Sequence, residues 1–173
     1  HWKQLQYLAL VLGPGLSQLC LARKLFLLSG SSRLIPIFVS QNLTNYDVDL
    51  PDDVIYRVNL AWINDLDNLK EIIKRHQNNK IFLDLPKNRT KPPNNKYSMD
   101  ELKPILDSSP NIKYFAISNV DSAEYLSEYL DYIPKNIVIV PKIESHLGIK
   151  NIEEITKLLR DEKIVMLDHD DLY

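Results

Sequence analysis

Residues 136–155 read NIVIVPKIESHLGIKNIEEI and predict an apolar strand, a short turn and the start of a helix. The strand delivers two charged residues, Lys142 and Glu144, to its C-terminal end. Side chains alternate along a strand, so these two should lie on the same face. Asn151 should begin the helix as its N-cap, with a glutamate at N3. Strand, turn and helix in this order form the unit of parallel α/β folds, whose ligands bind at the C-terminal strand ends.

The same unit recurs along the chain. Apolar runs of strand length occur at 7–12, 34–39, 54–62, 80–85, 113–120, 137–143 and 163–167, and helical patterns occur between them at 17–28, 63–76, 98–106 and 122–132. Pro36 predicts that its strand lies at an edge or is irregular. Asn64 and Ser98 are the expected caps of two helices, and Glu101 at N3 predicts a capping box with Ser98. The alternation predicts a single α/β domain over residues 1–173, a TIM-barrel-like repeat with mainly parallel strands. A complete barrel takes about 250 residues, so we expect an incomplete or truncated one.

The composition is that of a soluble globular domain. Of the 173 residues, 45% are hydrophobic and 25% are charged, and the net charge is −2. That balance gives no general attraction to nucleic acid or to an anionic membrane. Cys20 is the single cysteine, which excludes an intrachain disulfide framework and fits a reducing compartment. The most apolar stretch is interrupted by Pro14 and Arg23, which break a spanning helix. We therefore expect a cytoplasmic protein with neither a nucleic-acid nor a membrane partner.

Polar side chains recur where the predicted strands end. They are Arg57, Asn59, Asp84, Lys142, Glu144 and Asp171. Parallel strands place such ends on one face, so these groups should approach each other. Carboxylates beside a lysine and an arginine suit Mg²⁺, or Mn²⁺, holding a small anionic substrate through its oxygens. The metal would polarise a carbonyl or steady an enolate.

These motifs, in this order, resemble the barrel of the pyruvate kinase family. VPKIESHLGIKNIEEI followed by IVMLDHDDL resembles the family pattern A-K-I-E-N-x-x-G-x-x-N-x-x-E-I followed by I-M-V-A-R-G-D-L-G. Upstream, LVLGPG and YRVNLAW resemble T-L-G-P-A-S and A-R-L-N-F-S-H. FLDLPKNRT and FAISNVDSAEYL resemble L-D-T-K-G-P-E-I-R-T and S-F-V-R-S-A-E-D-V. The likeness covers most of the chain and implies a pyruvate-kinase-like barrel domain.

The resemblance implies a role for each matched residue. Glu144 and Asp171 would bind the divalent metal, Lys142 would stabilise the transferring phosphoryl group, and Arg57 would contact phosphate. Lys142 and Arg57 are thus the implied catalytic residues. Arg57, Lys142, Asp170 and Asp171 would bind substrate. The implied activity is metal-dependent phosphoryl transfer, a transferase reaction on phosphoenolpyruvate or a pyruvate-type enolate.

Several positions depart from the family pattern. Asn59 and Asp84 fall where the family holds a monovalent cation, but Ala61 and Leu85 replace the serine and threonine expected beside them. The implied potassium site is therefore incomplete. Asp170 replaces a glycine and would place a negative side chain beside the amides that hold the substrate carboxylate. The family's lid domain is reduced to the loop PKNRTKPPNNK.

Two other functions remain open. A class II aldolase or citrate-lyase-like carbon–carbon lyase presents a similar I-E-x-x-x-G-x-x-N pattern to one magnesium ion, although Lys142 favours phosphoryl transfer. A barrel remnant without catalysis would serve as a binding or assembly module. This hypothesis is motivated by the departures at Ala61, Leu85 and Asp170. A homo-oligomer or a larger parent chain would complete the barrel.

Overall fold

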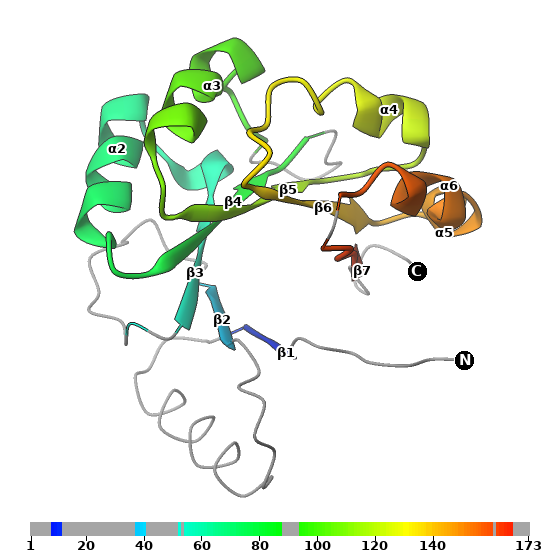
Figure 1. Ribbon diagram of the computed structural model, residues 1–173, viewed down its shortest axis with the longest axis horizontal. Helices are drawn as coiled ribbons and strands as arrows, with labels where there is room; N and C mark the ends of the chain where they lie inside the picture. The colour runs from blue at the N-terminus through cyan, green and yellow to red at the C-terminus, as the bar shows by residue number, and fades with distance from the viewer. Residues whose placement is uncertain are drawn as a thin grey trace, which may run out of the picture.

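The computed structural model describes the backbone at residues 8–11, 37–40, 52, 54–87, 94–160 and 162–167, with side chains described from residue 52 onward. Within these ranges the chain is α/β, with parallel strands in sequence order across one curled sheet (Figure 1). The strands are β1 (Leu8–Val11), β2 (Ile37–Ser40), β3 (Val54–Asn59), β4 (Lys80–Leu85), β5 (Ile112–Ile117), β6 (Val138–Ile143) and β7 (Met166–Leu167). The helices are η1 (Leu60–Trp62), α2 (Leu66–Arg75), α3 (Met99–Ser108), α4 (Ala123–Ser127), α5 (His146–Lys150) and α6 (Ile152–Lys157).

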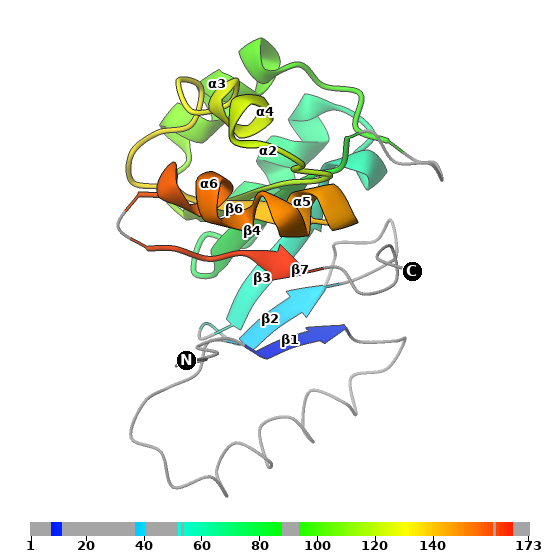
Figure 2. The same ribbon diagram turned by 90° about the vertical axis from the view of Figure 1, so that its right-hand side faces the viewer.

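Helices α2 to α6 all lie on one side of the sheet, and the sheet curls away from them through β3, β2 and β1 (Figure 2). Each strand pairs in parallel with the next one along the chain. A doubly wound sheet would reverse its strand order and carry helices on both faces. Sequential order with helices on one face is instead the arrangement of a barrel wall. The described part therefore forms a curled half-barrel, in which β1 and β7 are the edges.

Two apolar clusters cover the two faces of the sheet, as the alternation of strand side chains requires. The outer cluster packs the sheet against α2, α3, α4 and α6 and includes the fully buried Tyr56, Leu83 and Phe115. The inner cluster comprises Ile55, Phe82, Tyr114, Ala116 and Val140, with Val138, Ile164 and Met166 packed against it. A strand buried on both faces reads as a continuous apolar run, which explains the runs that mark β4, β5 and β6.

Each predicted strand overlaps an observed one, but the stretch predicted at 54–62 continues as η1 from Leu60 onward, and the edge position predicted for β2 is wrong. β2 is not an edge strand, because it pairs with β1 on one side and β3 on the other. It begins at Ile37, and Pro36 lies outside the described residues. The helix predicted at 17–28 lies outside the described residues.

The caps differ from expectation at two helices. Asp65, not Asn64, caps α2 by accepting a hydrogen bond from the backbone N–H of Asn68. Asn151 stands at the N-cap of α6 but makes no side-chain cap bond; its amide donates to the carbonyl of Asp121 at 2.8 Å instead. The predicted turn before it contains α5, capped by Ser145. The capping box expected at Ser98 is present at α3.

None of the helices in the described part is both long enough and apolar enough to cross a bilayer.

Candidate functional site

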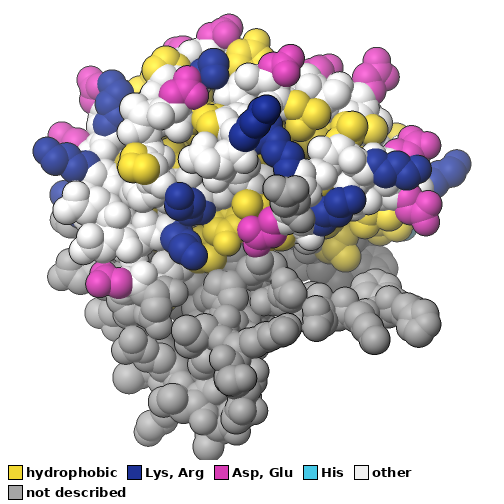
Figure 3. All heavy atoms as spheres, in the orientation of Figure 1, with side chains coloured by type: hydrophobic (Ala, Val, Ile, Leu, Met, Phe, Trp, Pro, Cys, Tyr) yellow, Lys and Arg dark blue, Asp and Glu magenta, His cyan; other side chains and the backbone are white. Residues whose placement is uncertain are grey.

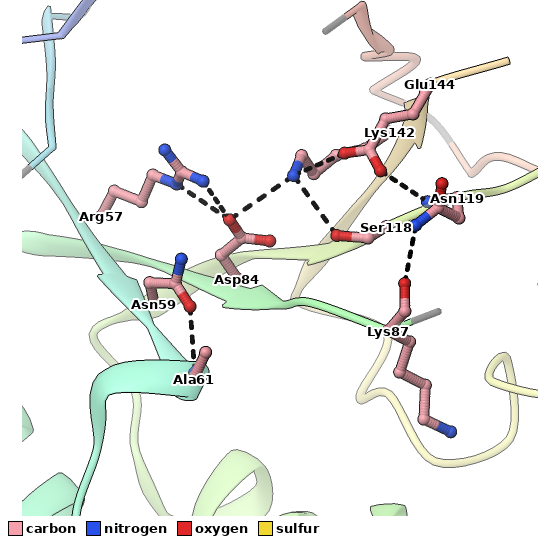
Figure 4. A network of polar contacts seen from close by, with 9 residues as sticks. All are labelled: Arg57, Asn59, Ala61, Asp84, Lys87, Ser118, Asn119, Lys142 and Glu144. Atoms are coloured by element: carbon pink, nitrogen blue, oxygen red, sulfur yellow. Dashed lines mark hydrogen bonds and ion pairs between the residues drawn. The ribbon is translucent and has the colours of Figure 1, made fainter. Parts of the chain in front are cut away.

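The inner face of the sheet changes from apolar to polar toward the C-terminal strand ends. The side chains that follow the inner apolar cluster there are Arg57 on β3, Asp84 on β4, Ser118 after β5, Lys142 on β6 and Glu144 after β6. We call these five residues the polar cluster (Figure 4). They come from four successive strands, and the parallel pairing and register of these strands bring them to one place. Parallel α/β folds bind their ligands at this end of the sheet, where the strands have their C-termini.

Asp84 is the fixed centre of the polar cluster. It is 0% exposed. Nε of Arg57 donates to its Oδ2 at 3.0 Å, and Nη2 of the same guanidinium forms an ion pair with that oxygen. Nζ of Lys142 lies 3.8 Å from the same oxygen. Two cations therefore share one carboxylate oxygen, an arrangement in which the positive charges offset the cost of burying Asp84.

Lys142 links the two carboxylates of the polar cluster. Its Nζ lies 2.7 Å from Oε1 of Glu144 and donates to Oγ of Ser118 at 3.3 Å. Lys142 is 4% exposed and Glu144 is 6% exposed. Charged side chains are almost never so deeply buried unless they are paired. Two cationic and two anionic side chains thus balance each other within one network, of which all but Arg57 is buried.

Glu144 is also held from the β5 side. Its Oε2 accepts a hydrogen bond from the backbone N–H of Asn119 at 3.2 Å. Nδ2 of Asn119 in turn donates to the carbonyl of Lys87 at 2.7 Å. The exits of β4, β5 and β6 are therefore joined by hydrogen bonds that converge on Asn119.

One oxygen of the polar cluster is left without a donor. Among the described residues, Oδ1 of Asp84 is buried and has no hydrogen-bond partner. A buried acceptor of this kind costs free energy unless a donor or a cation reaches it. Asn59, which was expected to share a monovalent cation with Asp84, turns its Oδ1 to the backbone N–H of Ala61 at 2.9 Å. That bond caps η1.

The donor set can be compared with the needs of a divalent cation. Within the described ranges, no group of three or more His, Cys, Asp and Glu side chains could hold a metal ion. Mg²⁺ needs only one or two protein carboxylates, since water and substrate oxygens complete its shell. Ligating carboxylates commonly accept hydrogen bonds as well, so Glu144 fits as one such ligand. Asp171 and Asp170, the other residues predicted here, lie outside the described residues.

Tyr114 lies on the inner face below the polar cluster, one inward position before Ala116. Burial raises the pKa of the Tyr114 phenol, and the nearby Glu162 carboxylate raises it further. Its ring stacks on Phe82 with centroids 6.1 Å apart. The inner cluster beneath the charges is therefore uncharged and largely apolar, which strengthens the electrostatic interactions above it.

The structure thus brings together Arg57, Asp84, Lys142 and Glu144, all of which the sequence suggested. It pairs Asp84 with Arg57 and Lys142, whereas the sequence placed Asp84 with Asn59. Sequence reasoning did not single out Ser118 and Asn119 as members of the site. Alternation along β5 could have indicated Ser118. It lies two residues after Ala116, and every second residue of a strand faces the same side of the sheet.

Comparison with known proteins assigns neither a family nor a function to the chain. No protein-family model matches the chain, and no curated protein sequence matches it. The likeness to the pyruvate kinase barrel therefore rests on the sequence motifs alone.

Proposed function

We propose that the chain is a pyruvate-kinase-like TIM-barrel domain that performs divalent-metal-dependent phosphoryl transfer on phosphoenolpyruvate or a pyruvate-type enolate. The observation that carries the proposal is Lys142, a buried ammonium between Asp84 and Glu144 at the C-terminal strand ends. We further propose a cytoplasmic protein that binds a small anionic substrate. A second copy or a longer parent chain would complete its barrel.

Arg57 supports the binding of an anionic group. Its side chain is 18% exposed, while the Asp84 that holds it is fully buried. A guanidinium has five N–H donors in a fixed fork, and those used on Asp84 orient the plane of the group. A guanidinium oriented in this way is a group that suits the planar geometry of phosphate or carboxylate.

Lys142 and Glu144 would act on the reacting end of the substrate. The Lys142 ammonium has three donors, and its bonds to Glu144 and Ser118 hold it in place before substrate arrives. Negative charge that develops on a transferring oxygen would be stabilised by this preorganised cation. Glu144 would hold the divalent metal, which when bound polarises a phosphoryl or carbonyl oxygen.

Calorimetric titration of Mg²⁺ and phosphoenolpyruvate tests the proposal. The wild-type chain should bind phosphoenolpyruvate only with Mg²⁺ present, and Glu144→Gln should abolish that metal-dependent binding. Glu153→Gln is the matched control, because Glu153 is an exposed carboxylate on α6 outside the polar cluster. Equal binding by the wild type and Glu144→Gln contradicts the proposal.

The same samples separate the two alternatives. Metal-dependent release of pyruvate from a hydroxy-keto acid, without phosphoenolpyruvate binding, would indicate the aldolase or citrate-lyase-like function. If the chain neither binds phosphoenolpyruvate nor releases pyruvate, and if Lys142→Ala keeps its fold, the chain is a binding or assembly module.

A further inference from the structure

Asn119 has an uncommon backbone conformation at the edge of the polar cluster. Its φ of 52° makes it the one described non-glycine residue with a positive φ. L-residues avoid this left-handed region because Cβ approaches a backbone oxygen, although asparagine tolerates it better than most. Such a conformation persists where surrounding contacts determine it, and these conformations concentrate at functional sites.

The contacts of residues 118–120 explain what the conformation achieves. Ser118 accepts from the Lys142 ammonium at 3.3 Å, and Asn119 donates its backbone N–H to Oε2 of Glu144 at 3.2 Å. The next backbone N–H, that of Val120, donates to the carbonyl of Lys142 at 3.0 Å. Three consecutive residues after β5 therefore contact the end of β6, and only the middle one reaches the Glu144 carboxylate.

The Asn119 side chain makes a separate bond. Its Nδ2 donates to the carbonyl of Lys87, the second residue after β4, at 2.7 Å. In this left-handed conformation, Asn119 donates to the Lys87 carbonyl with its side chain and to Glu144 with its backbone N–H. Figure 4 shows Asn119 between the two partners.

We propose that Asn119 is a positioning residue of the site and acts through Glu144. Its left-handed backbone aims the N–H at Oε2 and holds the carboxylate beside the Lys142 ammonium, in the orientation that a cation and an anionic substrate require. The inference rests on the proposed function for its effect on binding, but the contact itself can be tested independently.

Two substitutions separate the backbone from the side chain. Asn119→Gly and Asn119→Val both remove the bond to the Lys87 carbonyl. Glycine adopts positive φ freely, whereas a β-branched residue resists it strongly. If the backbone positions Glu144, the glycine variant keeps the N–H bond and the valine variant loses it. If the side-chain bond to Lys87 matters instead, both variants lose function equally.

The first measurement does not depend on any ligand. Amide hydrogen exchange, read by NMR, compares Asn119 with Val120 in the wild type, Asn119→Gly and Glu144→Gln. We expect the residue-119 amide to be protected in the wild type and the glycine variant. It should exchange about tenfold faster relative to Val120 in Glu144→Gln, because a hydrogen bond to a charged acceptor is weakened. An unchanged ratio overturns the proposal.

The second measurement is calorimetry with Mg²⁺ and phosphoenolpyruvate. We expect the glycine variant to bind within about threefold of the wild type and the valine variant to bind about tenfold to hundredfold more weakly, because the charge-assisted bond is lost. Equal losses in both variants overturn the proposal. If the wild type itself does not bind, the proposed function fails, and the exchange ratio still decides whether Asn119 positions Glu144.

Discussion

At the scale of single residues, burial distinguishes two lysine–carboxylate pairs of the same length. Nζ of Lys142 lies 2.7 Å from Glu144, and Nζ of Lys70 lies 2.8 Å from Asp67. The side chains of the first pair are 5% and 3% exposed, and those of the second are 59% and 89% exposed. Water screens the attraction between Lys70 and Asp67. The charges of Lys142 and Glu144 are shielded from water, so each depends on the other and on neighbouring protein groups for its stabilisation.

Lys142→Met should therefore lower the free energy of unfolding by about 3–5 kcal/mol, because it leaves Glu144 buried without its counter-ion. Lys70→Met makes the same chemical change in the exposed pair and should cost less than about 1 kcal/mol. Urea denaturation at neutral pH measures both. Equal losses in the two variants would mean that Glu144 does not depend on the Lys142 ammonium.

At the scale of elements, α3 begins with a complete capping box. The backbone N–H and the hydroxyl of Ser98 each donate to Oε2 of Glu101 at 2.8 Å, and the Glu101 N–H donates to the Ser98 hydroxyl at 3.2 Å. The backbone hydrogen bond, followed by the side-chain one, lowers the pKa of the Glu101 carboxyl. The charged carboxylate is thus the form that caps the helix.

This cap predicts a pH dependence. The pKa of Glu101 is lower in the folded state than in the unfolded state. The carboxylate therefore contributes to the free energy of unfolding above the unfolded-state pKa, and this contribution is lost as pH falls through the folded-state pKa. Glu101→Gln keeps the size of the side chain and removes the charge. Its Tm should be lower than that of the wild type at pH 7, and the two Tm values should converge as the pH falls through the lowered folded-state pKa of Glu101.

Glu71→Gln, at an exposed position within α2, is the control for a general change of charge. A Tm difference between wild type and Glu101→Gln that stays constant from neutral to acidic pH would contradict the capping role.

Helix α5 depends on a glycine for its close approach to the sheet. A Cβ placed on Gly148 would lie 2.7 Å from the Val120 carbonyl oxygen and 2.9 Å from Cγ2 of Ile143. The first neighbour is backbone and the second is buried in the core, so neither can move away freely. Gly148 thereby sets the distance between α5 and the strand that carries Lys142.

Gly148→Ala should lower the free energy of unfolding by about 1–3 kcal/mol, because overpacking forces the backbone to shift. Leu147→Ala on the same helix is the control: Leu147 is 53% exposed, so the change should stay within about 0.5 kcal/mol. Chemical denaturation of both variants provides the comparison. Wild-type stability in Gly148→Ala would show that α5 can move away from the sheet without cost.

At the scale of the whole molecule, strands β3 to β6 have buried side chains on both faces. The outer cluster joins them to the helices, and the inner cluster lies under the polar cluster. Figure 3 shows acidic and basic side chains interspersed over the described part of one face. A surface of mixed sign produces no strong long-range field, so recognition of an anion would depend on the local polar cluster.

Because the same strands carry both clusters, the described sheet should unfold as one unit. Phe115→Ala in the outer cluster and Phe82→Ala in the inner one should each cost about 3–5 kcal/mol, as buried aromatic residues do. Far-ultraviolet and near-ultraviolet circular dichroism should give coincident transitions. Trp62→Ala is the control, since Trp62 is 37% exposed. Separate transitions in Phe82→Ala would show that the inner face is an independent unit.

The sequence by itself determined the local secondary structure and the succession of its elements along the chain. Apolar runs such as those of β4 and β6 predict strands buried on both faces, and they occur where predicted. The Ser98 capping box was also readable, because its bonds join residues three apart. The parallel α/β class followed from the alternation of these elements. Arg57, Asp84, Lys142 and Glu144 were readable as strand-end charges.

Only the tertiary structure decided which of these charges meet. Arg57 and Asp84 are 27 residues apart, and no local pattern specifies that the arginine, and not Asn59, takes the carboxylate. The contribution of Asn119 was equally hidden, since it comes from a backbone N–H, a group that every residue except proline carries. Sequence patterns record periodicity and side-chain type, whereas contacts between strands depend on how the sheet curls and on register across several strands.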